Sequence, residues 1–290
     1  MVVQGNEAAA ESVEDLRFPT IPNHELLRCI GRGAYGEVWL ARNTLGAFHA
    51  VKVVHRSSFD HSAPFDREFR GIQHYTPLSR THHGLVRILH VGRNKESGYF
   101  YYVMELGDCE VNGQNIQPET YCAKNLANEL DRRRQLPLRE CLRLAMELAE
   151  ALQYLHSRQL VHRDIKPSNI IYVDGVPKFA DVGLVTHAAE GRLDTTRFLG
   201  TEGFVPPEGL GTPGADVFSL GKVLYEAWVG QPASAFPSGC EEDSPGNQEP
   251  AVAHFHQVIC KACAPDSKQR YRSVMELQRD LLQLSDQIPD

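Results

Sequence analysis

The chain has 290 residues, of which 42% are hydrophobic and 23% are charged, so it is long enough to bury a large core in two lobes or domains. Its formal net charge is −7, and no run of Lys or Arg is long enough to form a nucleic-acid tract. This balance argues against a nucleic-acid partner. No apolar stretch approaches the roughly 20 residues that a bilayer-spanning helix needs, so we expect no membrane span in this chain.

The seven cysteines are scattered, without the regular spacing of a disulfide framework. An odd count with such spacing suits a reducing compartment, and the acidic first twenty residues do not resemble a signal peptide. We therefore predict a cytoplasmic globular protein and leave open a membrane tether outside this chain. The sequence indicates no oligomeric state.

One group of residues has the composition of a zinc site and includes a C-x-x-C pair: His254, His256, Cys260 and Cys263. The two histidines are only two positions apart, so on a helix they would point to different faces. The apolar residues of the same segment follow a helical period. We therefore favour an ordinary amphipathic core helix over a zinc site.

The N-terminal part of the chain has the pattern of a sheet. Residues 1–22 are acidic, Ala-rich and without a hydrophobic period, which predicts a flexible leader. A helix is predicted at residues 66–75, and we expect residues 23–107 to form a first lobe with a five-stranded antiparallel sheet. The strands are predicted, from short apolar runs between polar or Gly-rich turns, at residues 26–30, 37–42, 48–54, 85–92 and 99–106.

The remaining residues, 108–290, have the pattern of a mainly helical lobe. A polar, Gly- and Asn-rich connector follows Gly107 and marks the lobe boundary. A Pro- and Ser-rich excursion at residues 232–250 predicts a surface loop. Helical periodicity predicts helices at residues 138–155, 215–229, 252–262 and 273–285. The expected fold class is thus α+β, with two lobes.

Residues 31–38 read Gly-Arg-Gly-Ala-Tyr-Gly-Glu-Val, which is a G-x-G-x-x-G-x-V pattern. Its glycines would let backbone amides approach phosphate oxygens without interference from a Cβ atom. By itself the pattern also fits a Gly-rich hairpin turn. A Rossmann fingerprint is disfavoured, because it needs a helix directly after the last glycine, whereas residues 38–41 continue as a strand.

Lys52 lies on a predicted strand that would place its ammonium group beneath the glycine loop, where it can hold the α and β phosphates of a nucleotide. A single lysine on a strand is usually a solvated edge charge. The glycine loop before it and the acidic helix after it favour the phosphate role. Glu68, on that helix, is the natural partner for the ammonium group.

The most informative segment is His-Arg-Asp-Ile-Lys-Pro-Ser-Asn, at residues 162–169. One hairpin would bring Asp164 and Asn169 together with Asp181 around a nucleotide. Carboxylate and amide oxygens are ligands that Mg²⁺ prefers. A triphosphate is so anionic that Mg²⁺ and Lys52 must neutralise part of its charge before a nucleophile can approach.

In their order and rough spacing these motifs resemble those of eukaryotic-type protein kinases, over about residues 25–285. The resemblance implies the bilobal protein-kinase fold, with ATP and either Mg²⁺ or Mn²⁺ as cofactors. It also implies transfer of the γ-phosphate of ATP to Ser/Thr hydroxyls of protein substrates. The Pro-Pro-Glu segment at residues 206–208 and the Arg-Tyr-Arg-Ser segment at residues 270–273 favour a bacterial-like member.

The resemblance assigns roles to the matching positions. Asp164 is the implied catalytic base, and Asn169 and Asp181 are the implied metal ligands. Lys166 is expected to face the γ-phosphate and, with Thr201, favours a Ser/Thr acceptor; Lys52 and Glu68 complete the catalytic set. Nucleotide contacts are implied, besides Lys52, for Ile30, Gly31, Arg32, Gly33, Ala34, Tyr35, Gly36, Val38, Ala50, Met104, Glu105, Gly107 and Ile171.

The resemblance also implies two supporting contacts and one departure. Glu208 and Arg270 would form a structural ion pair, and Asp216 would brace the backbone of the catalytic loop. Val182 stands where the family most often has Phe. The smaller side chain would loosen the active arrangement unless its neighbours repack around it.

A regulatory role is implied for Arg163, which would receive a phosphorylated Thr195 or Thr196. We expect autophosphorylation at these threonines to order the activation loop. The alternative is that both are plain exposed loop residues.

Two other functions stay open at this point. A pseudokinase scaffold would keep the fold without turnover, but such proteins usually lack one of the groups that match Lys52, Asp164 and Asp181, all present here. A small-molecule kinase, acting for example on an aminoalcohol, is disfavoured by Lys166 and by residues 200–208.

Overall fold

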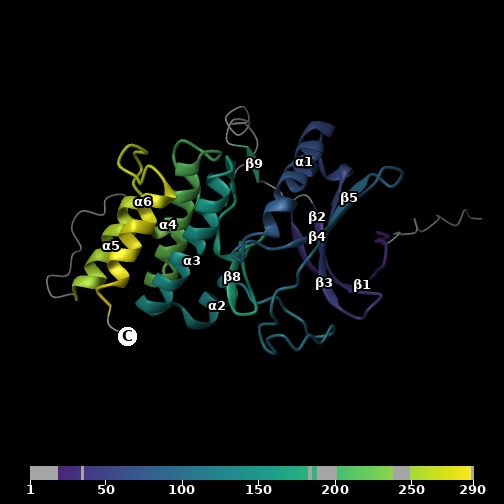
Figure 1. Ribbon diagram of the computed structural model, residues 1–290, viewed down its shortest axis with the longest axis horizontal. Coiled ribbons are helices and arrows are strands. Elements are labelled where there is room, and N and C mark those ends of the chain that lie inside the picture. Colours follow the sequence, from purple (N-terminus) through teal and green to yellow (C-terminus); the bar gives the residue numbers. More distant parts are fainter. Residues whose placement is uncertain (1–18, 34–35, 182–184, 188–200, 238–248, 289–290) are drawn as a thin grey trace, which may run out of the picture.

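The computed structural model has two lobes, a sheet with one helix and a helical region beside it (Figure 1). The structure describes residues 19–33, 36–181, 185–187, 201–237 and 249–288. The expected α+β architecture, with a five-stranded antiparallel sheet followed by a mainly helical lobe, is confirmed.

The N-terminal sheet has the strand order β1-β2-β3-β5-β4, with every neighbouring pair antiparallel. Side chains of β5 alternate between the two faces, so that Phe100 belongs to the main core and Tyr101 to a second cluster. Phe65 of α1 (Ser62–Ser79) packs on Phe100, with ring centroids 5.0 Å apart. The strands are β1 (His24–Gly33), β2 (Gly36–Asn43), β3 (Phe48–His55), β4 (Ile88–Asn94) and β5 (Tyr99–Met104).

The packed chain begins earlier than the leader predicted at residues 1–22 allows. Ile21 is only 3% exposed and belongs to the same cluster as Tyr101. The Tyr99 hydroxyl donates to the Thr20 carbonyl and accepts from the Thr20 amide, both at 3.0 Å. The rest of the predicted leader, residues 1–18, lies outside the described residues.

Two N-terminal elements differ in extent from their predictions. The helix predicted at residues 66–75 is longer, because α1 continues through Pro77 to Ser79. The strand predicted at residues 85–92 begins only at Ile88, since Leu85 bridges to Phe179 in the second lobe. The chain that enters β4 is thereby tied to both lobes.

The four helices predicted in the second lobe are confirmed as α3 (Leu138–His156), α4 (Pro213–Val229), α5 (Pro250–Ala262) and α6 (Val274–Ser285). A further helix, α2 (Leu126–Arg133), is short and rich in charge, and Leu126 and Leu130 are its only large apolar residues. It begins at Asn125, whose side chain accepts a hydrogen bond from the Asn128 amide at 2.9 Å. The lobe also contains β6 (Leu160–Val161), β7 (Ile170–Val173), β8 (Val176–Phe179) and β9 (Thr186–His187), and the 3₁₀ helices are η1 (Arg56–Ser58), η2 (Pro167–Asn169) and η5 (Ala233–Ala235).

The prediction of an amphipathic helix at residues 252–262 is confirmed by burial in α5. Phe255, Val258 and Ile259 are buried in the main core. Gly221 of α4 allows α5 to approach closely, since a Cβ atom at this position would lie 2.8 Å from both the Ala262 Cβ and the Cys263 Sγ. Of the loop predicted at residues 232–250, residues 238–248 lie outside the described residues.

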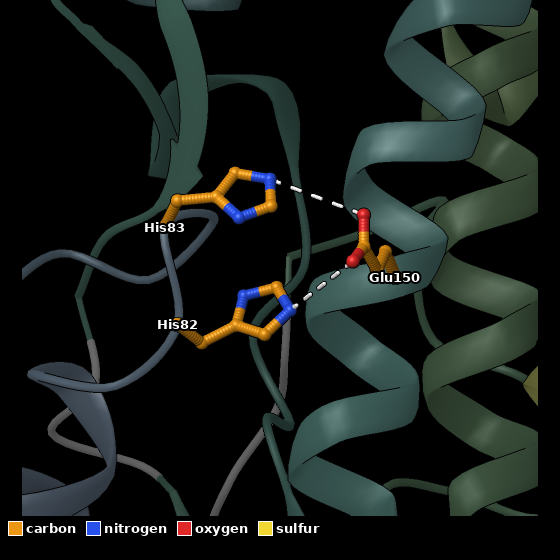
Figure 2. Close-up of side chains that lie close together, drawn as sticks. All are labelled: His82, His83 and Glu150. Atoms are coloured by element: carbon orange, nitrogen blue, oxygen red, sulfur yellow. Dashed lines mark ion pairs between the residues drawn. The ribbon is translucent and has the colours of Figure 1, made fainter.

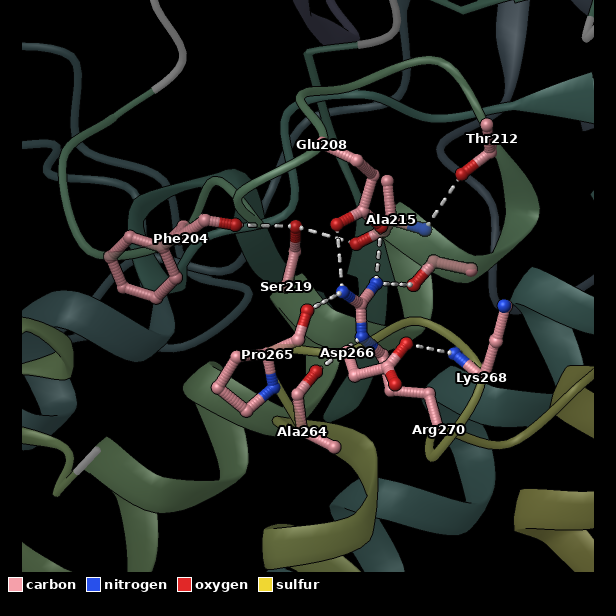
Figure 3. A network of polar contacts seen from close by, with 11 residues as sticks. Phe204, Glu208, Thr212, Ala215, Ser219, Ala264, Pro265, Asp266, Lys268 and Arg270 are labelled. Carbon is pink, nitrogen blue, oxygen red and sulfur yellow. Dashed lines mark hydrogen bonds and ion pairs between the residues drawn. The ribbon is translucent and has the colours of Figure 1, made fainter. Parts of the chain in front are cut away.

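The segment before α4 is anchored by Arg270, as the sequence predicted (Figure 3). The guanidinium group donates to both carboxylate oxygens of Glu208, at 2.5 and 2.8 Å, and to the carbonyls of Ala264, Gly214 and Pro265. Burial would raise the pKa of Glu208, but the hydrogen bonds from Arg270 hold it below its ordinary value. The Arg270 side chain is 1% exposed and the Glu208 side chain 35%, so the pair is buried at its guanidinium end.

We expect Arg270→Ala to lower the free energy of unfolding by about 3 kcal/mol, because it removes a buried bidentate partner and leaves several carbonyls without a donor. Urea unfolding followed by circular dichroism measures this change. Arg272→Ala, at an exposed position two residues away, is the matched control and should change stability little. Equal urea midpoints for the two variants would contradict the structural role of the pair.

Candidate active site

The loop between β6 and β7, residues 162–169, is held from below by Asp216 of α4. One carboxylate oxygen of Asp216 accepts the His162 amide at 2.8 Å, and the other accepts the Arg163 amide at 2.9 Å. Arg163 has φ +71°, a left-handed conformation that costs free energy for a residue with a side chain. The bonds to Asp216 stabilise this conformation, and the predicted brace is confirmed.

His156, at the end of α3, was not singled out from the sequence. Its Nε2 atom lies 2.9 Å from Asp216 Oδ2, which makes it a third partner of the same carboxylate. Burial would raise the pKa of Asp216, but the His156 bond and the neighbouring donors lower it. In the sequence His156 looks like an ordinary polar residue at a helix end, because its partner lies 60 residues away.

Three polar side chains converge directly above this brace. The Asn169 amide nitrogen donates to the Asp164 carbonyl at 2.9 Å and to its carboxylate at 2.7 Å. Lys166 Nζ lies 3.1 Å from the same carboxylate and donates to the Thr201 hydroxyl at 3.0 Å. Asp164 is therefore fixed in orientation by hydrogen bonds from Asn169 and by an ion pair with Lys166.

Lys52, on β3, brings a cation from the first lobe to this group. Its ammonium group forms an ion pair with Asp181 and lies 3.9 Å from Glu68 of α1. Asp181 follows β8 and has φ +51°, and the preceding Ala180 amide donates to the Asn169 carbonyl at 2.8 Å. The structure thus brings together Lys52, Glu68, Asp164, Asn169 and Asp181 as the sequence placed them.

The charges of this group shift each other's pKa values. Burial would raise the pKa of Asp181, but the charge of Lys52 and a hydrogen bond from it lower it below its ordinary value. Burial would lower the pKa of Lys52, but Asp181 and other neighbours raise it. Burial raises the pKa of Glu68 to about 7 despite the charge of Lys52. The Lys52 ammonium group therefore pairs with Asp181 more closely than with Glu68.

The donor atoms fit a hard divalent cation. Because the amide nitrogen of Asn169 is turned toward Asp164, its carbonyl oxygen faces away from that carboxylate. The Asp181 side chain is 42% exposed and has only one oxygen on Lys52, which leaves a carboxylate oxygen accessible. An amide oxygen and a carboxylate oxygen from adjoining segments are a donor set that Mg²⁺ or Mn²⁺ accepts.

The glycine motif lies where β1 turns into β2. Gly33 pairs with Gly36 across the turn, and Val38 pairs with Lys52 across β2 and β3. A Cβ atom at Gly36 would collide with the Val53 carbonyl, so this position requires glycine. Ala34 and Tyr35 lie outside the described residues, and the exposed Arg32 side chain pairs with Glu37 at 3.2 Å. Ile30 and Gly31 lie on β1 just before the turn.

The segment after β5 offers backbone groups at the edge of the sheet. The Glu105 amide donates to the Arg87 carbonyl at 3.0 Å, and the Gly107 carbonyl accepts from the Tyr121 hydroxyl at 2.9 Å. Among the described residues, the Glu105 carbonyl and the Gly107 amide have no such intramolecular partner. They present one acceptor and one donor, which is what the edge of an adenine ring requires.

Apolar residues from both lobes lie around this edge. Ala50 of β3 is 5% exposed and pairs with Met104 of β5. From the second lobe, Ile171 Cδ1 lies 3.6 Å from the point where a Cβ atom of Gly107 would be. Ala50, Met104 and Ile171, which the sequence predicted around the adenine, therefore lie close to the backbone of Glu105 and Gly107.

The Glu105 side chain links the two lobes at the same place. One of its carboxylate oxygens accepts the Arg87 amide at 2.8 Å and the Lys178 ammonium group at 2.7 Å. Lys178 lies on β8 in the second lobe. The sequence singled out only the backbone of Glu105, because nothing near it in the chain indicates a partner 73 residues away.

Comparison with known proteins identifies the family. A family model described as protein kinase domain matches residues 24–287. The chain belongs to the protein kinase domain family. In the part of the chain that the structure describes, no helix combines the length and the apolar character needed to cross a bilayer.

Several relatives of this kinase domain are serine/threonine kinases. The serine/threonine-protein kinase PknA of Mycobacterium tuberculosis is 34% identical over 218 residues, which are 72% of this chain and 47% of the relative. Mouse Aurora kinase B is 30% identical over 244 residues, 82% of this chain and 65% of the relative. PrkC of Bacillus subtilis is 29% identical over 276 residues, 89% of this chain and 40% of the relative. The chain thus spans about half the length of these curated relatives.

We predict that the titration of Glu68 lowers the stability of the folded chain as pH rises. The pKa of about 7 in the folded chain exceeds the ordinary 4.5, so the folded state binds more protons between these values. The contribution of Glu68 to stability therefore falls as pH rises from about 4.5 to about 7, by up to about 3 kcal/mol.

Urea unfolding of nucleotide-free protein across this pH range, compared with Glu68→Gln, measures the effect. The neutral amide does not titrate. The free energy of unfolding of the variant, relative to that of the wild type, should therefore increase as pH rises. Parallel stability curves for the two proteins would contradict the raised pKa.

Proposed function

We propose that the chain is a protein serine/threonine kinase that transfers the γ-phosphate of ATP to Ser and Thr hydroxyls of protein substrates. The observation that carries the proposal is the convergence of Lys52 from the first lobe with Asp164, Asn169 and Asp181 from the second. These segments lie far apart in the sequence, and they meet where Lys52 of β3 pairs with Asp181. Family membership and the names of the relatives support the same activity.

Asp164 is the group best placed to accept the proton of the substrate hydroxyl. Asn169 and Lys166 orient its carboxylate, and orientation of the acceptor hydroxyl contributes more to such a transfer than proton abstraction. Lys166 can follow the transferred phosphoryl group, and Thr201 holds its ammonium group in place.

Lys52 and the glycine motif would hold the phosphates of the nucleotide. The ammonium group of Lys52 neutralises Asp181 in this structure and can neutralise phosphate oxygens in the same way. Asn169 and Asp181 are the residues that would hold Mg²⁺ or Mn²⁺, which supplies charge neutralisation at the β and γ oxygens. The Glu105 carbonyl and Gly107 amide would bind the adenine edge.

A cavity of about 180 Å³ beside the catalytic loop suits a polypeptide acceptor. It is lined by Lys166, Thr201 and Phe204 together with residues of α2 and α4. It therefore opens directly onto the residues that handle the acceptor hydroxyl. This position supports protein substrates over small aminoalcohols.

Asp164→Asn should lower kcat about 10² to 10⁴-fold, the usual contribution of a positioned general base. A radiolabelled-ATP assay with generic protein acceptors measures the loss, and circular dichroism verifies that the variant is folded. Lys52→Met is the companion variant, and it should lower turnover by weakening phosphate binding. Near-unchanged turnover in both variants would overturn the proposed activity and favour a scaffold.

We further propose that the kinase phosphorylates its own Thr195 or Thr196, both of which lie outside the described residues, as does Val182. Arg163 is 4% exposed, and burial together with the nearby charge of Arg67 lowers the pKa of its guanidinium group. Two cations close together attract a phosphate dianion. A phosphothreonine bound there would relieve their repulsion and order the segment before Thr201.

Incubation with ATP and Mg²⁺ should therefore add phosphate at Thr195 or Thr196, which phosphopeptide mapping detects. Thr195→Ala/Thr196→Ala should lower activity about tenfold, the effect of one or two charge-assisted hydrogen bonds. Asp164→Asn protein is the control and should carry no phosphate there. Full activity in the double variant would exclude a regulatory role.

A further inference from the structure

The loop between α1 and β4 brings two neighbouring histidines against α3. Gly84 permits a close approach, since a Cβ atom there would lie 2.8 Å from the Ala151 Cβ of α3. The Phe179 amide donates to the Gly84 carbonyl at 3.1 Å, and the Leu85 amide donates to the His82 carbonyl at 3.3 Å. The loop backbone is thereby fixed relative to the second lobe.

Both histidine rings are directed at Glu150 of α3 (Figure 2). The rings of His82 and His83 are stacked, with centroids 4.9 Å apart and an interplanar angle of 15°. The Nε2 atom of each ring lies 3.9 Å from a different carboxylate oxygen of Glu150. A separation of 3.9 Å is too long for a hydrogen bond, so each imidazole is within ion-pair distance of the carboxylate without a hydrogen bond to it.

We propose that His82, His83 and Glu150 form a binding site for a divalent transition metal, Zn²⁺ or a similar ion, which joins the loop after α1 to helix α3. Their candidate ligand atoms all lie within 4.8 Å of one another. Two ligands of one tetrahedral zinc are roughly 3.4 Å apart, given bonds of about 2.1 Å. The 3.9 Å separations therefore need to shorten by only about half an ångström.

The chemistry of the three donors fits this class of ion. Two imidazoles and one carboxylate are a zinc donor set that leaves a fourth position for water. At pH 7 an unperturbed imidazole is mostly neutral and has a lone pair available. Mg²⁺ and Ca²⁺ prefer oxygen ligands, so the pair of nitrogens selects against the ions expected at the catalytic carboxylates.

The site combines one anchored ligand with two adjustable ones. The His82 side chain is 10% exposed and packs on the Tyr154 ring of α3, with centroids 4.7 Å apart. The side chains of His83 and Glu150 are 59% and 57% exposed. They can therefore move to close around an ion that enters from solvent.

The charged neighbours of the site are two carboxylates, Glu147 and Glu150, and two cations, Arg143 and Arg158. Glu147 lies one turn before Glu150 on the same face of α3, and its Oε2 atom is buried without a hydrogen-bond partner among the described residues. The charge of His83 acts on Glu147, as does that of Arg143. Arg158 faces His82 from the end of α3 but stacks on Tyr154, with its guanidinium carbon 3.5 Å from the ring centroid.

Metal binding at His82 has an identifiable cost. In the metal-free chain its Nδ1 atom accepts a hydrogen bond from the Gly84 amide at 3.1 Å, which places the ring proton on Nε2. Coordination through Nε2 releases that proton, and Nδ1 takes one up from solvent, so the bond to Gly84 opens. The loss of one such bond weakens metal binding roughly fivefold.

Calorimetric titration of the whole chain with ZnCl₂ tests the site. Excess Mg²⁺ is present to occupy the oxygen donors around Asp181. We expect one zinc ion per chain, and at least tenfold weaker binding in both Glu150→Gln and His83→Ala. His61→Ala is the matched control, because it removes an exposed histidine at the opposite end of α1 and should leave the affinity unchanged.

Thermal unfolding supplies a second readout, because an ion that binds only the folded chain raises its midpoint. Zinc should raise the midpoint of wild type and His61→Ala but not that of Glu150→Gln. The midpoints without zinc establish that each variant is folded. Unchanged zinc affinity in Glu150→Gln and His83→Ala, or no binding by the wild type, would overturn the site.

Discussion

The geometry of the candidate active site depends on the hydrogen bonds that the buried carboxylate of Asp216 accepts. This carboxylate accepts the amides of His162 and Arg163 and contacts the His156 ring. A buried carboxylate is costly unless its oxygens are satisfied, and here three partners from two segments satisfy it. Asp164 follows Arg163 directly, so the most buried helix of the molecule sets the position of the proposed base through the backbone.

The charged groups of the candidate active site neutralise one another when no nucleotide is bound. Lys52 pairs with Asp181, and Lys166 pairs with Asp164. Phosphates could pair with Lys52 and Lys166, and a divalent cation could pair with Asp181, so binding would exchange the partners of these groups. Glu68 is the exception, because burial raises its pKa and Lys52, which lies closer to Asp181, offsets that effect only in part.

Sequence reasoning predicted the site better than it predicted the contacts that hold the site in place. Lys52, Asp164, Asn169 and Asp181 belong to motifs whose residue types follow from the chemistry of a triphosphate, so their convergence could be expected. His156 and the side chain of Glu105 could not, because each acts on a partner 60 or more residues away. In the fold, short apolar runs between turns identified the strands of the N-terminal sheet, and helical periods identified α1 and the four longer helices of the second lobe. The short, charged α2 was missed, because an apolar pattern of two leucines over eight residues is too brief to identify a helix.

The carboxylate of Glu105 joins the two lobes at the point where the chain passes from one to the other. The same oxygen holds the Arg87 amide of the first lobe and the Lys178 ammonium group of the second. Both side chains are mostly buried, with 12% of Lys178 and 20% of Glu105 exposed, so ionic screening weakens the contact little. A rotation that separates the two lobes at this point must therefore break a shielded ionic contact.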